Sequence, residues 1–595
     1  MFAFSSVNRW LADRRGAALL LVLAALAAYG NSFHGPFVFD DVPSITDNPT
    51  IRSLSSAWQP PTDAGITVAG RPLLNVSFAL NYSLSGDDVW SYHALNLLIH
   101  LVAALLLYGL VRHTAESSSH TPAARDAAAL TALGAALLWV VHPLTTAAVT
   151  ASVQRAESLA ACWMLATLYT FARGAAAPAA RWWTLLAITS CFAGVATKEI
   201  AAVTPVLVLL YDRTFVAGTF AQALRQRARL YVALAASWLL LAALMATTGA
   251  RGGSVGFATA LPWWHYTLQQ SVALVHYVRL VFWPHPLVFD YGTPVLTSLS
   301  AALPTLLVVG CALLGTAVAL WRAPRVGFFA ATFFLLLAPS SSVLPIATQT
   351  MAEHRVYLPL AVIVIACGFG LTRLAGRFAL AVCLGLAVVL GSLTWQRNLT
   401  YQDEVRLWRD TAAAAPSNPR AHHNLGFALA ARHERTEAVT AYRQALTLDP
   451  SYADALNNLG NTLLELGQVT EAHDLLHRAT VAAPANAEAW NGLGNATPTL
   501  DDAIAAYRRA VALAPNYAIA QSNLGLALAR RGDNADALAA LQTAVNLAPR
   551  DVALRNNLAN FLAAQGRTGE AAMHYAQALA DDSHSALTRF NRGSL

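Results

Sequence analysis

The chain has 595 residues, of which 56% are hydrophobic and only 12% are charged, and its net charge is +6. A soluble globular domain carries about twice that charged fraction, so the composition excludes a single soluble domain and indicates a membrane protein. The excess of arginine does not indicate a nucleic-acid-binding protein, because the arginines are scattered or lie at the ends of apolar segments.

Eleven apolar segments are long enough to cross a membrane. The first follows Arg9, Arg14 and Arg15 and precedes no small-residue cleavage site, so we expect an uncleaved signal anchor. If this arginine cluster is cytoplasmic, the arginines between the later segments are cytoplasmic too. The expected spans are residues 16–31, 92–111, 126–141, 147–171, 182–197, 200–216, 229–248, 298–320, 326–345, 357–373 and 378–395.

A further hydrophobic stretch, residues 265–292, is not counted as a span, because a twelfth crossing would move four later arginines to the outside. Its polar residues and flanking tryptophans predict an amphipathic helix that lies in the outer interface or re-enters it. We therefore expect an all-α membrane domain over residues 1–398, with a large first external loop at 32–91. An odd number of crossings leaves that loop and the C-terminal part on one non-cytoplasmic face.

The C-terminal part, residues 399–595, is expected to be a separate repeat domain. Pro416, Pro450, Pro484, Pro515 and Pro549 recur with a period close to 34 residues, and glycines and acidic-alanine pairs recur in parallel registers. This pattern predicts about five helix-turn-helix units of the tetratricopeptide type, with a shortened helix in the third unit. Stacked units leave a concave groove that binds a peptide or an extended chain. Four asparagines recur on the first helices, where they either face this groove or merely cap and solvate helices: Asn424, Asn458, Asn491 and Asn523.

An acidic doublet, Asp40 and Asp41, follows the first apolar segment in the sequence GPFVFDDVP. A carboxylate beside aromatic residues at the membrane interface is held where its basicity can be tuned. We expect one of the two to be a catalytic base. Asp40 is preferred, since neighbours in an extended loop point to opposite sides and Asp41 would face Arg71 or solvent. The alternative is a solvated pair, the usual role of such a doublet.

Polar residues at the boundaries of later segments form a second set of candidates. Arg71 and His93 are candidates for binding an anionic group, although His93 also suits an interfacial helix. His142 precedes an apolar helix that carries Arg155 and Glu157 near its start. Charges within a span usually face a cavity or each other. These two stand two residues apart and cannot pair along one helix face, so a functional role and internal pairing both stay open.

Lys198 is the only lysine among 39 basic residues, which leaves 38 arginines. A single retained ammonium indicates a need for a compact charge, against a phosphate group or the neighbouring Glu199, although chance retention is the alternative. His354 and Arg355 precede the tenth span. A guanidinium binds phosphate through paired hydrogen bonds, whereas an arginine that only reaches for the interface is the alternative.

Several of these segments, in this order and joined to this repeat tail, resemble the TMTC family of multi-pass mannosyltransferases. They are the D-D doublet, G-R-P, W-S-Y-H-A-L-N, V-H-P-L-T-T-A-A-V with Q-R-A-E-S-L, T-K-E, F-W-P-H-P-L-V-F-D-Y and E-H-R-V-Y-L-P. The resemblance implies a glycosyltransferase of the GT-C class, which moves a sugar, mannose in eukaryotic members, from a polyprenyl-phosphate lipid to an acceptor on the outer face. The composition, rich in alanine and arginine, indicates a bacterial member with its repeats in the periplasm.

On this interpretation, Asp40 or Asp41 takes the proton of a protein hydroxyl, while Arg355 and Lys198, with Arg71, stabilise the departing lipid phosphate. Supporting polar residues are His93, His142, Arg155, Glu157, Glu199 and His354. No metal site is expected, and the need for a divalent cation stays open. Two alternatives remain: a membrane-anchored tetratricopeptide scaffold for envelope assembly, and a polymerase or ligase of lipid-linked glycans.

Overall fold

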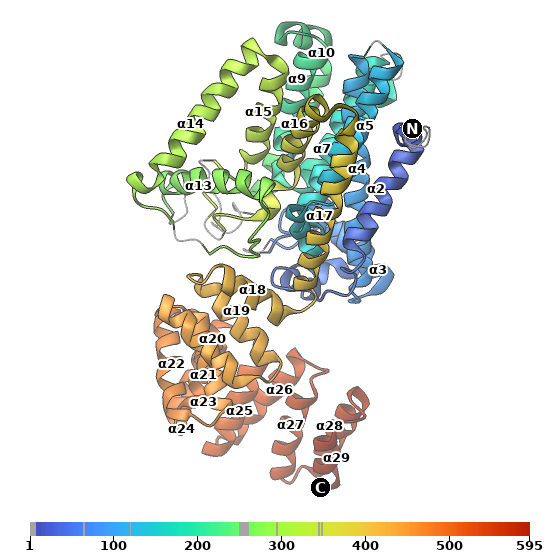
Figure 1. The fold of residues 1–595 in the computed structure, drawn as a ribbon. Coiled ribbons are helices and arrows are strands. Elements are labelled where there is room, and N and C mark those ends of the chain that lie inside the picture. The colour runs from blue at the N-terminus through green and yellow to red at the C-terminus, as the bar shows by residue number, and fades with distance from the viewer. Residues whose placement is uncertain are drawn as a thin grey trace. The chain divides into compact units, whose positions relative to one another are not determined.

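The computed structural model describes residues 8–62, 66–119, 121–177, 179, 181–248, 261–292, 295–342, 345–346 and 349–594. Every regular element in these ranges is a helix, so the all-α prediction is confirmed (Figure 1). The chain divides into two compact units, Met1–Ala415 and Pro416–Leu595. The first unit extends beyond the expected boundary at 398 because α18 (Glu404–Ala414) packs within it, with Trp408 almost fully buried.

The first unit is built from long helices joined by short turns. The long helices are α2 (Arg14–Tyr29), α3 (Pro72–Ser85), α4 (Trp90–Ser117), α5 (Pro122–Val140), α7 (Arg155–Ala176), α8 (Arg181–Thr197), α9 (Thr204–Phe215), α10 (Phe220–Ala235), α11 (Ser237–Thr247), α13 (Trp263–Phe282), α14 (Leu299–Arg322), α15 (Pro324–Leu337), α16 (Tyr357–Ala375), α17 (Ala379–Tyr401) and α18. The short elements are η1 (Val42–Thr46), η2 (Pro49–Arg52), η3 (Ser56–Trp58), η4 (Pro143–Thr145), α6 (Thr146–Thr150), η5 (Ser152–Gln154), η6 (Glu199–Val203), η7 (Glu353–Val356) and η8 (Gly376–Phe378).

Five of the described helical stretches are long and apolar enough to cross a membrane, and Pro324–Leu337 is a shorter apolar helix. The five are Trp90–Ser117, Pro122–Val140, Phe220–Thr247, Leu299–Arg322 and Glu353–Tyr401. The expected span 326–345 is wrong in its last part, because α15 ends at Leu337, and the expected span 147–171 is wrong in its first part, because the short helical turns of α6 and η5 precede α7. The Asn96 side chain stabilises these turns by donating to the carbonyl of Val149 at 3.0 Å.

Residues 265–292, expected as one amphipathic segment, are helical only as far as Phe282 and continue as irregular chain to residue 292. Trp263, Trp264 and Trp283, which flank the helix, are all exposed. Figure 1 shows α13 running nearly crosswise to α4 and α7. Exposed tryptophans at the ends of a crosswise helix are typical of a segment anchored at a membrane interface.

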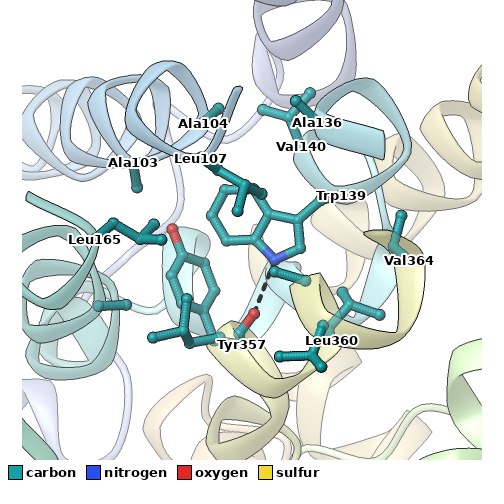
Figure 2. Close-up of a cluster of buried hydrophobic side chains, with 14 of the residues drawn as sticks. Ala103, Ala104, Leu107, Ala136, Trp139, Val140, Leu165, Tyr357, Leu360 and Val364 are labelled. Atoms are coloured by element: carbon teal, nitrogen blue, oxygen red, sulfur yellow. Dashed lines mark hydrogen bonds between the residues drawn. The ribbon is translucent and has the colours of Figure 1, made fainter. Parts of the chain in front are cut away.

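The core of the first unit is centred on Trp139, which is fully buried where α4, α5, α7 and α16 meet (Figure 2). Its indole N–H donates to the carbonyl of Tyr357 at 2.9 Å. The ring nitrogens of His100 lie 2.7 Å from the Tyr357 hydroxyl and 2.9 Å from the carbonyl of Val140. Buried polar atoms are thus paired within the apolar core, as such atoms must be. The contacts of Tyr357 fix the start of α16, and Arg355 lies two residues before that start.

The second unit contains five antiparallel helix pairs and a terminal helix. They are α19 (Pro419–Ala431) with α20 (Arg435–Leu448), α21 (Ala453–Glu465) with α22 (Val469–Ala482), α23 (Ala487–Ala496) with α24 (Leu500–Leu513), α25 (Ala518–Arg531) with α26 (Asn534–Leu547), α27 (Val552–Ala564) with α28 (Thr568–Asp581), and α29 (Ala586–Gly593). The glycine register follows from packing: a Cβ at Gly426 or Gly494 would lie 2.7 Å or 2.5 Å from the facing tyrosine ring. The expected short helix of the third unit is confirmed, because α23 has 10 residues.

Candidate active site

The acidic doublet lies in a turn between α2 and η1, not in the extended loop that we expected. Asp41 is 1% exposed. Its carboxylate accepts hydrogen bonds from the backbone N–H groups of Val38, at 3.0 Å, and Val153, at 2.6 Å. The expectation that Asp41 faces Arg71 or solvent is therefore wrong, because the two N–H groups hold it inward and tie the doublet to the turns before α7.

Asp40 is half-buried and lines a small cleft with Asp41. The cleft has a volume of about 20 Å³, and its lining also includes Gln154, Asp290, Glu353 and His354. A space of this size accommodates a group no larger than a water molecule or a hydroxyl. The two neighbouring aspartates thus have different environments: Asp41 is held by the backbone, and Asp40 borders the open space.

Phe39, directly before the doublet, has a left-handed backbone with φ of 52°. This conformation is costly for an aromatic residue, and such strain persists only where the surroundings fix it. The Phe39 ring packs edge-on against Phe289, with ring centres 6.2 Å apart, and against Trp408, at 5.5 Å. The packed Phe39 ring before Asp40 and the hydrogen-bonded Asp41 after it therefore fix the orientation of Asp40.

Glu353, which also lines the cleft, is 4% exposed. It accepts hydrogen bonds from the N–H of Val288 at 2.5 Å and from the hydroxyl of Tyr291 at 2.9 Å. These contacts join η7 to the chain that follows α13. They also explain why Asp290, which the sequence analysis did not select as a site residue, is brought into the cleft, since it stands between the two donors.

A cationic cluster adjoins the cleft. The Lys198 ammonium lies 2.6 Å from the Glu157 carboxylate, and Nε2 of His354 lies 3.9 Å from the same oxygen. Lys198 therefore pairs with Glu157 and not with its neighbour Glu199, because the extended backbone at residue 198 turns the two side chains apart. Burial lowers the pKa of Lys198, and the Glu157 charge opposes that shift.

Arg71, at the start of α3, donates to both carboxylate oxygens of Glu199 at 3.1 Å and to the carbonyl of Thr67 at 2.8 Å. The sequence placed Arg71 and Glu199 on the same face of the membrane but not in contact. Their pairing connects the segment before α3 to the T-K-E segment, and it brings a second cation into the cluster around Lys198.

Arg355 lines a separate cavity of about 10 Å³ together with Glu157. Its guanidinium donates to the carbonyls of Ser340 at 3.0 Å, Thr350 at 3.2 Å and Gln349 at 2.5 Å. Neutral carbonyls satisfy its hydrogen bonds without neutralising its charge. The guanidinium charge of Arg355 therefore lies at the cavity that it shares with Glu157.

Three other candidates hold the framework of the site. His93 is buried and its Nε2 lies 2.9 Å from the carbonyl of Gly35, just before the doublet. His142 accepts from the N–H of Leu144, and its Nε2 lies 3.0 Å from the carbonyl of Val281; burial lowers its pKa to about 4. Arg155 is fully buried and binds α3 and the start of α4. Their contacts favour structural roles over contact with a substrate.

Arg397 of α17 did not enter the sequence analysis. It is 8% exposed and donates to Asp410 at 2.7 Å, while its Nε and second Nη are buried and have no hydrogen-bond partner among the described residues. Arg397 also lies close enough to Glu353 for the two charges to attract each other. The sequence offered one indication of Arg397: it is a basic residue just after the last expected span, on the side expected to be non-cytoplasmic, where arginine is less frequent.

The repeat asparagines form contacts between neighbouring units. Asn458 lies 3.0 Å from the ring Nε2 of His423, and Asn523 donates to Asn491 at 2.9 Å. Asn424 pairs through its oxygen with His423 at 3.0 Å. The four asparagines therefore belong to a polar network between first helices. They do not cap helix ends, although capping was part of one of the two interpretations.

Asp41 gives a pH-dependent contribution to stability. Burial raises its pKa from 3.8 to about 7, while the two backbone hydrogen bonds oppose the shift and the Asp40 charge adds to it. The folded protein binds this proton more tightly than the unfolded chain, so the contribution is complete below about pH 4 and is lost as pH rises through about 7.

The stability difference between the wild type and Asp41→Asn should therefore shrink by on the order of 2 kcal/mol between pH 5 and pH 8. Thermal unfolding in detergent at both pH values measures it, with all other titrations cancelling in the difference. A difference that is constant or grows with pH would show that Asp41 ionises as an ordinary carboxyl.

Family models described as TPR repeat and tetratricopeptide repeat match residues 434–467 and residues 457–518, 499–549 and 522–586. They confirm the predicted repeat domain. The chain is also similar to TTC0263, a thermophilic TPR protein in Thermus thermophilus. The identity is 26%, the match covers 30% of this chain and 97% of that chain, and the TM-score is 0.28.

Other relatives of the chain are named protein O-mannosyl-transferases. Human TMTC3 is 32% identical over 187 residues, which are 30% of this chain and 19% of that protein. F38B6.6 of Caenorhabditis elegans is 26% identical over 450 residues, which are 72% of this chain and 62% of that protein. Mouse TMTC1 is 33% identical over 168 residues, 27% of this chain and 17% of that protein. The matches thus span less than two thirds of each relative, and they confirm the resemblance that the motifs indicate.

Proposed function

We propose that this TMTC-like chain is an integral-membrane glycosyltransferase that transfers a sugar, mannose by analogy with its relatives, from a polyprenyl-phosphate lipid to a protein hydroxyl. The reaction takes place on the extracytoplasmic face, and the repeats bind the acceptor. In a bacterial cell this places the protein in the inner membrane with the repeats in the periplasm. The relatives named as protein O-mannosyl-transferases support the reaction class.

The observation that carries the proposal is the adjacency of an acidic cleft and a cationic cluster. Asp40 lines the cleft together with His354, and His354 lies 3.9 Å from Glu157, which in turn binds Lys198. Glu157 also lines the cavity of Arg355. A base on one side and positive charge on the other side of a common wall is the arrangement that glycosyl transfer from a phosphate leaving group needs.

In the proposed step, the acceptor hydroxyl oxygen attacks the anomeric carbon of the sugar and Asp40 receives its proton. The bond from that carbon to the phosphate oxygen breaks, and the electron pair leaves with the polyprenyl phosphate. Arg355, Lys198 and Arg71 stabilise the charge that develops there. All three now contact protein oxygens, so donor binding exchanges these contacts for phosphate and widens the small cleft by movement of its lining side chains.

The test of this function is transfer by the purified full-length protein in detergent from a polyprenyl-phosphate mannose to a protein acceptor, followed by intact-protein mass spectrometry. A gain of one hexose on serine or threonine is the expected result. Transfer from a nucleotide sugar alone, or no transfer from any lipid-linked sugar by folded protein, would contradict the proposal.

The repeat asparagines are expected to select the acceptor. The double change Asn458→Ala and Asn523→Ala, in the full chain, should raise the KM for a protein acceptor about thirtyfold, since each of the two lost hydrogen bonds costs about 1 kcal/mol. Turnover of a short serine peptide should stay the same, and the exposed Asn516→Ala provides the control. Equal losses for the protein and the peptide would assign these asparagines to folding.

A further inference from the structure

A second cavity lies at the other end of the helices that frame the candidate active site. Its volume is about 210 Å³, and it lies between the first turn of α2 and the last turns of α4 and α7. Three arginines line it, Arg14, Arg112 and Arg173, together with Glu116. With His113 neutral, three positive charges against one negative leave a surplus of two. We call it the basic pocket.

The basic pocket is one membrane thickness away from the cleft. Arg155 and Arg173 stand 18 residues apart on α7, and 18 residues of α-helix are about 27 Å long. Arg155 lies at the level of the external loop, since it binds α3 and the start of α4. The hydrocarbon core of a bilayer is about 30 Å thick. The basic pocket is therefore at the opposite membrane surface and takes no part in the proposed transfer.

The pocket's charge is only partly neutralised within the protein. Arg112 binds Glu116 at 2.7 Å and the Tyr108 hydroxyl at 2.7 Å. Arg173 lies over the Trp183 ring, with its guanidinium carbon 5.4 Å from the ring centre. Within the residues that the structure describes, neither Arg14 nor Arg173 forms an ion pair with a carboxylate. Basic residues that orient a protein in the membrane explain why arginines lie near this surface. That role does not require three of them to line one cavity.

The lining of the basic pocket is amphipathic along the membrane normal. Ala18 is one turn deeper on α2 than Arg14, and Leu105 is two turns deeper on α4 than Arg112; both line the pocket. Tyr169 approaches the backbone of Gly109, where a Cβ would lie 3.0 Å from its ring. A cationic and aromatic mouth above an apolar floor matches a phosphate headgroup attached to acyl chains and does not match a freely soluble anion.

We propose that the basic pocket binds the phosphate headgroup of an anionic phospholipid in the leaflet opposite the candidate active site. The guanidinium groups of Arg14 and Arg173 pair with the headgroup phosphate, and the first part of an acyl chain lies along Leu105 and Ala18. Basic pockets between membrane helices recognise headgroups in this way, with a contribution that corresponds to about a fivefold change in binding for each arginine.

The experiment uses the full-length protein in nanodiscs that contain equal amounts of phosphatidylglycerol and phosphatidylcholine, and native mass spectrometry counts the lipids that stay bound after release. The wild type should retain phosphatidylglycerol preferentially. The double variant Arg14→Gln with Arg173→Gln should lose this preference by roughly tenfold or more. The same two positions changed to lysine should keep most of it, which separates loss of charge from loss of folding.

The matched control removes two exposed arginines outside the pocket, Arg322→Gln with Arg325→Gln, and should keep the preference. A loss as large in this control, or an unchanged preference in the pocket variant, would overturn the proposal. A separate arm adds inorganic phosphate to the wild-type protein. If phosphate displaces the retained lipid or stabilises the protein equally well, the occupant is a soluble anion and the lipid assignment is wrong.

Discussion

Replacing Asp40 by asparagine is expected to lower the rate constant for sugar transfer by roughly 10²–10⁴-fold, while donor binding changes little. The substitution keeps the size of the side chain and removes its basicity. Asp40 borders the cleft, whereas both oxygens of Asp41 accept backbone hydrogen bonds. Single-turnover transfer with a labelled lipid-linked sugar measures the rate, and binding of the same donor is measured separately.

Two controls identify the base within the cleft. Asp290→Asn should reduce transfer less than Asp40→Asn, because Asp290, although it lines the cleft, is only 2% exposed. Arg355→Lys keeps the charge and loses the planar fork, so it should weaken donor binding or leaving-group departure and leave the pH profile unchanged. Near-wild-type transfer by both Asp40→Asn and Asp41→Asn, in protein that inserts and folds, would end the enzymatic interpretation of the doublet.

The repeat domain follows almost completely from the sequence, and the membrane unit follows less. A period of 34 residues fixes helix pairs through local packing, and the short third helix is visible as a three-residue deletion. Hydropathy, in contrast, reports only average burial. The fourth expected span, residues 147–171, therefore wrongly included the turns before α7. Those turns exist because Asn96 and Asp41, which are distant in sequence, satisfy their backbone groups.

The residue types of the candidate site could be predicted, but their pairing could not. The single lysine indicated a special charge at Lys198, yet its partner is Glu157 on another helix and not the adjacent Glu199. Contacts of this kind depend on how helices are placed side by side, and one sequence carries no information about that placement. Asp290 and Arg397 were missed for the same reason, since each acquires its neighbours only in the folded chain.

Loss of Arg155 is expected to destabilise the membrane unit strongly. Its guanidinium donates to the Asn96 oxygen at 2.5 Å, the Asn81 oxygen at 2.7 Å, and the carbonyls of Ser77 and Tyr92, each at 3.0 Å. Hydrogen bonds to a charged group contribute about 1.5–3 kcal/mol each, and buried acceptors left alone cost more. The guanidinium also lies 4.5 Å above the Phe78 ring.

Arg155→Met should therefore cost at least about 4 kcal/mol of unfolding free energy, seen as a large fall in Tm or as failure to purify in a monodisperse form. Arg155→Lys should recover only part of this, because one ammonium cannot reach acceptors on α3 and α4 together. The exposed Arg325→Met provides a control for loss of an arginine. The two interpretations that the sequence left open for Arg155 give opposite results. A variant that keeps the wild-type Tm but has lost transfer would make Arg155 a substrate contact. Parallel losses of stability and transfer would identify it as the anchor that holds α3 and the start of α4 against α7.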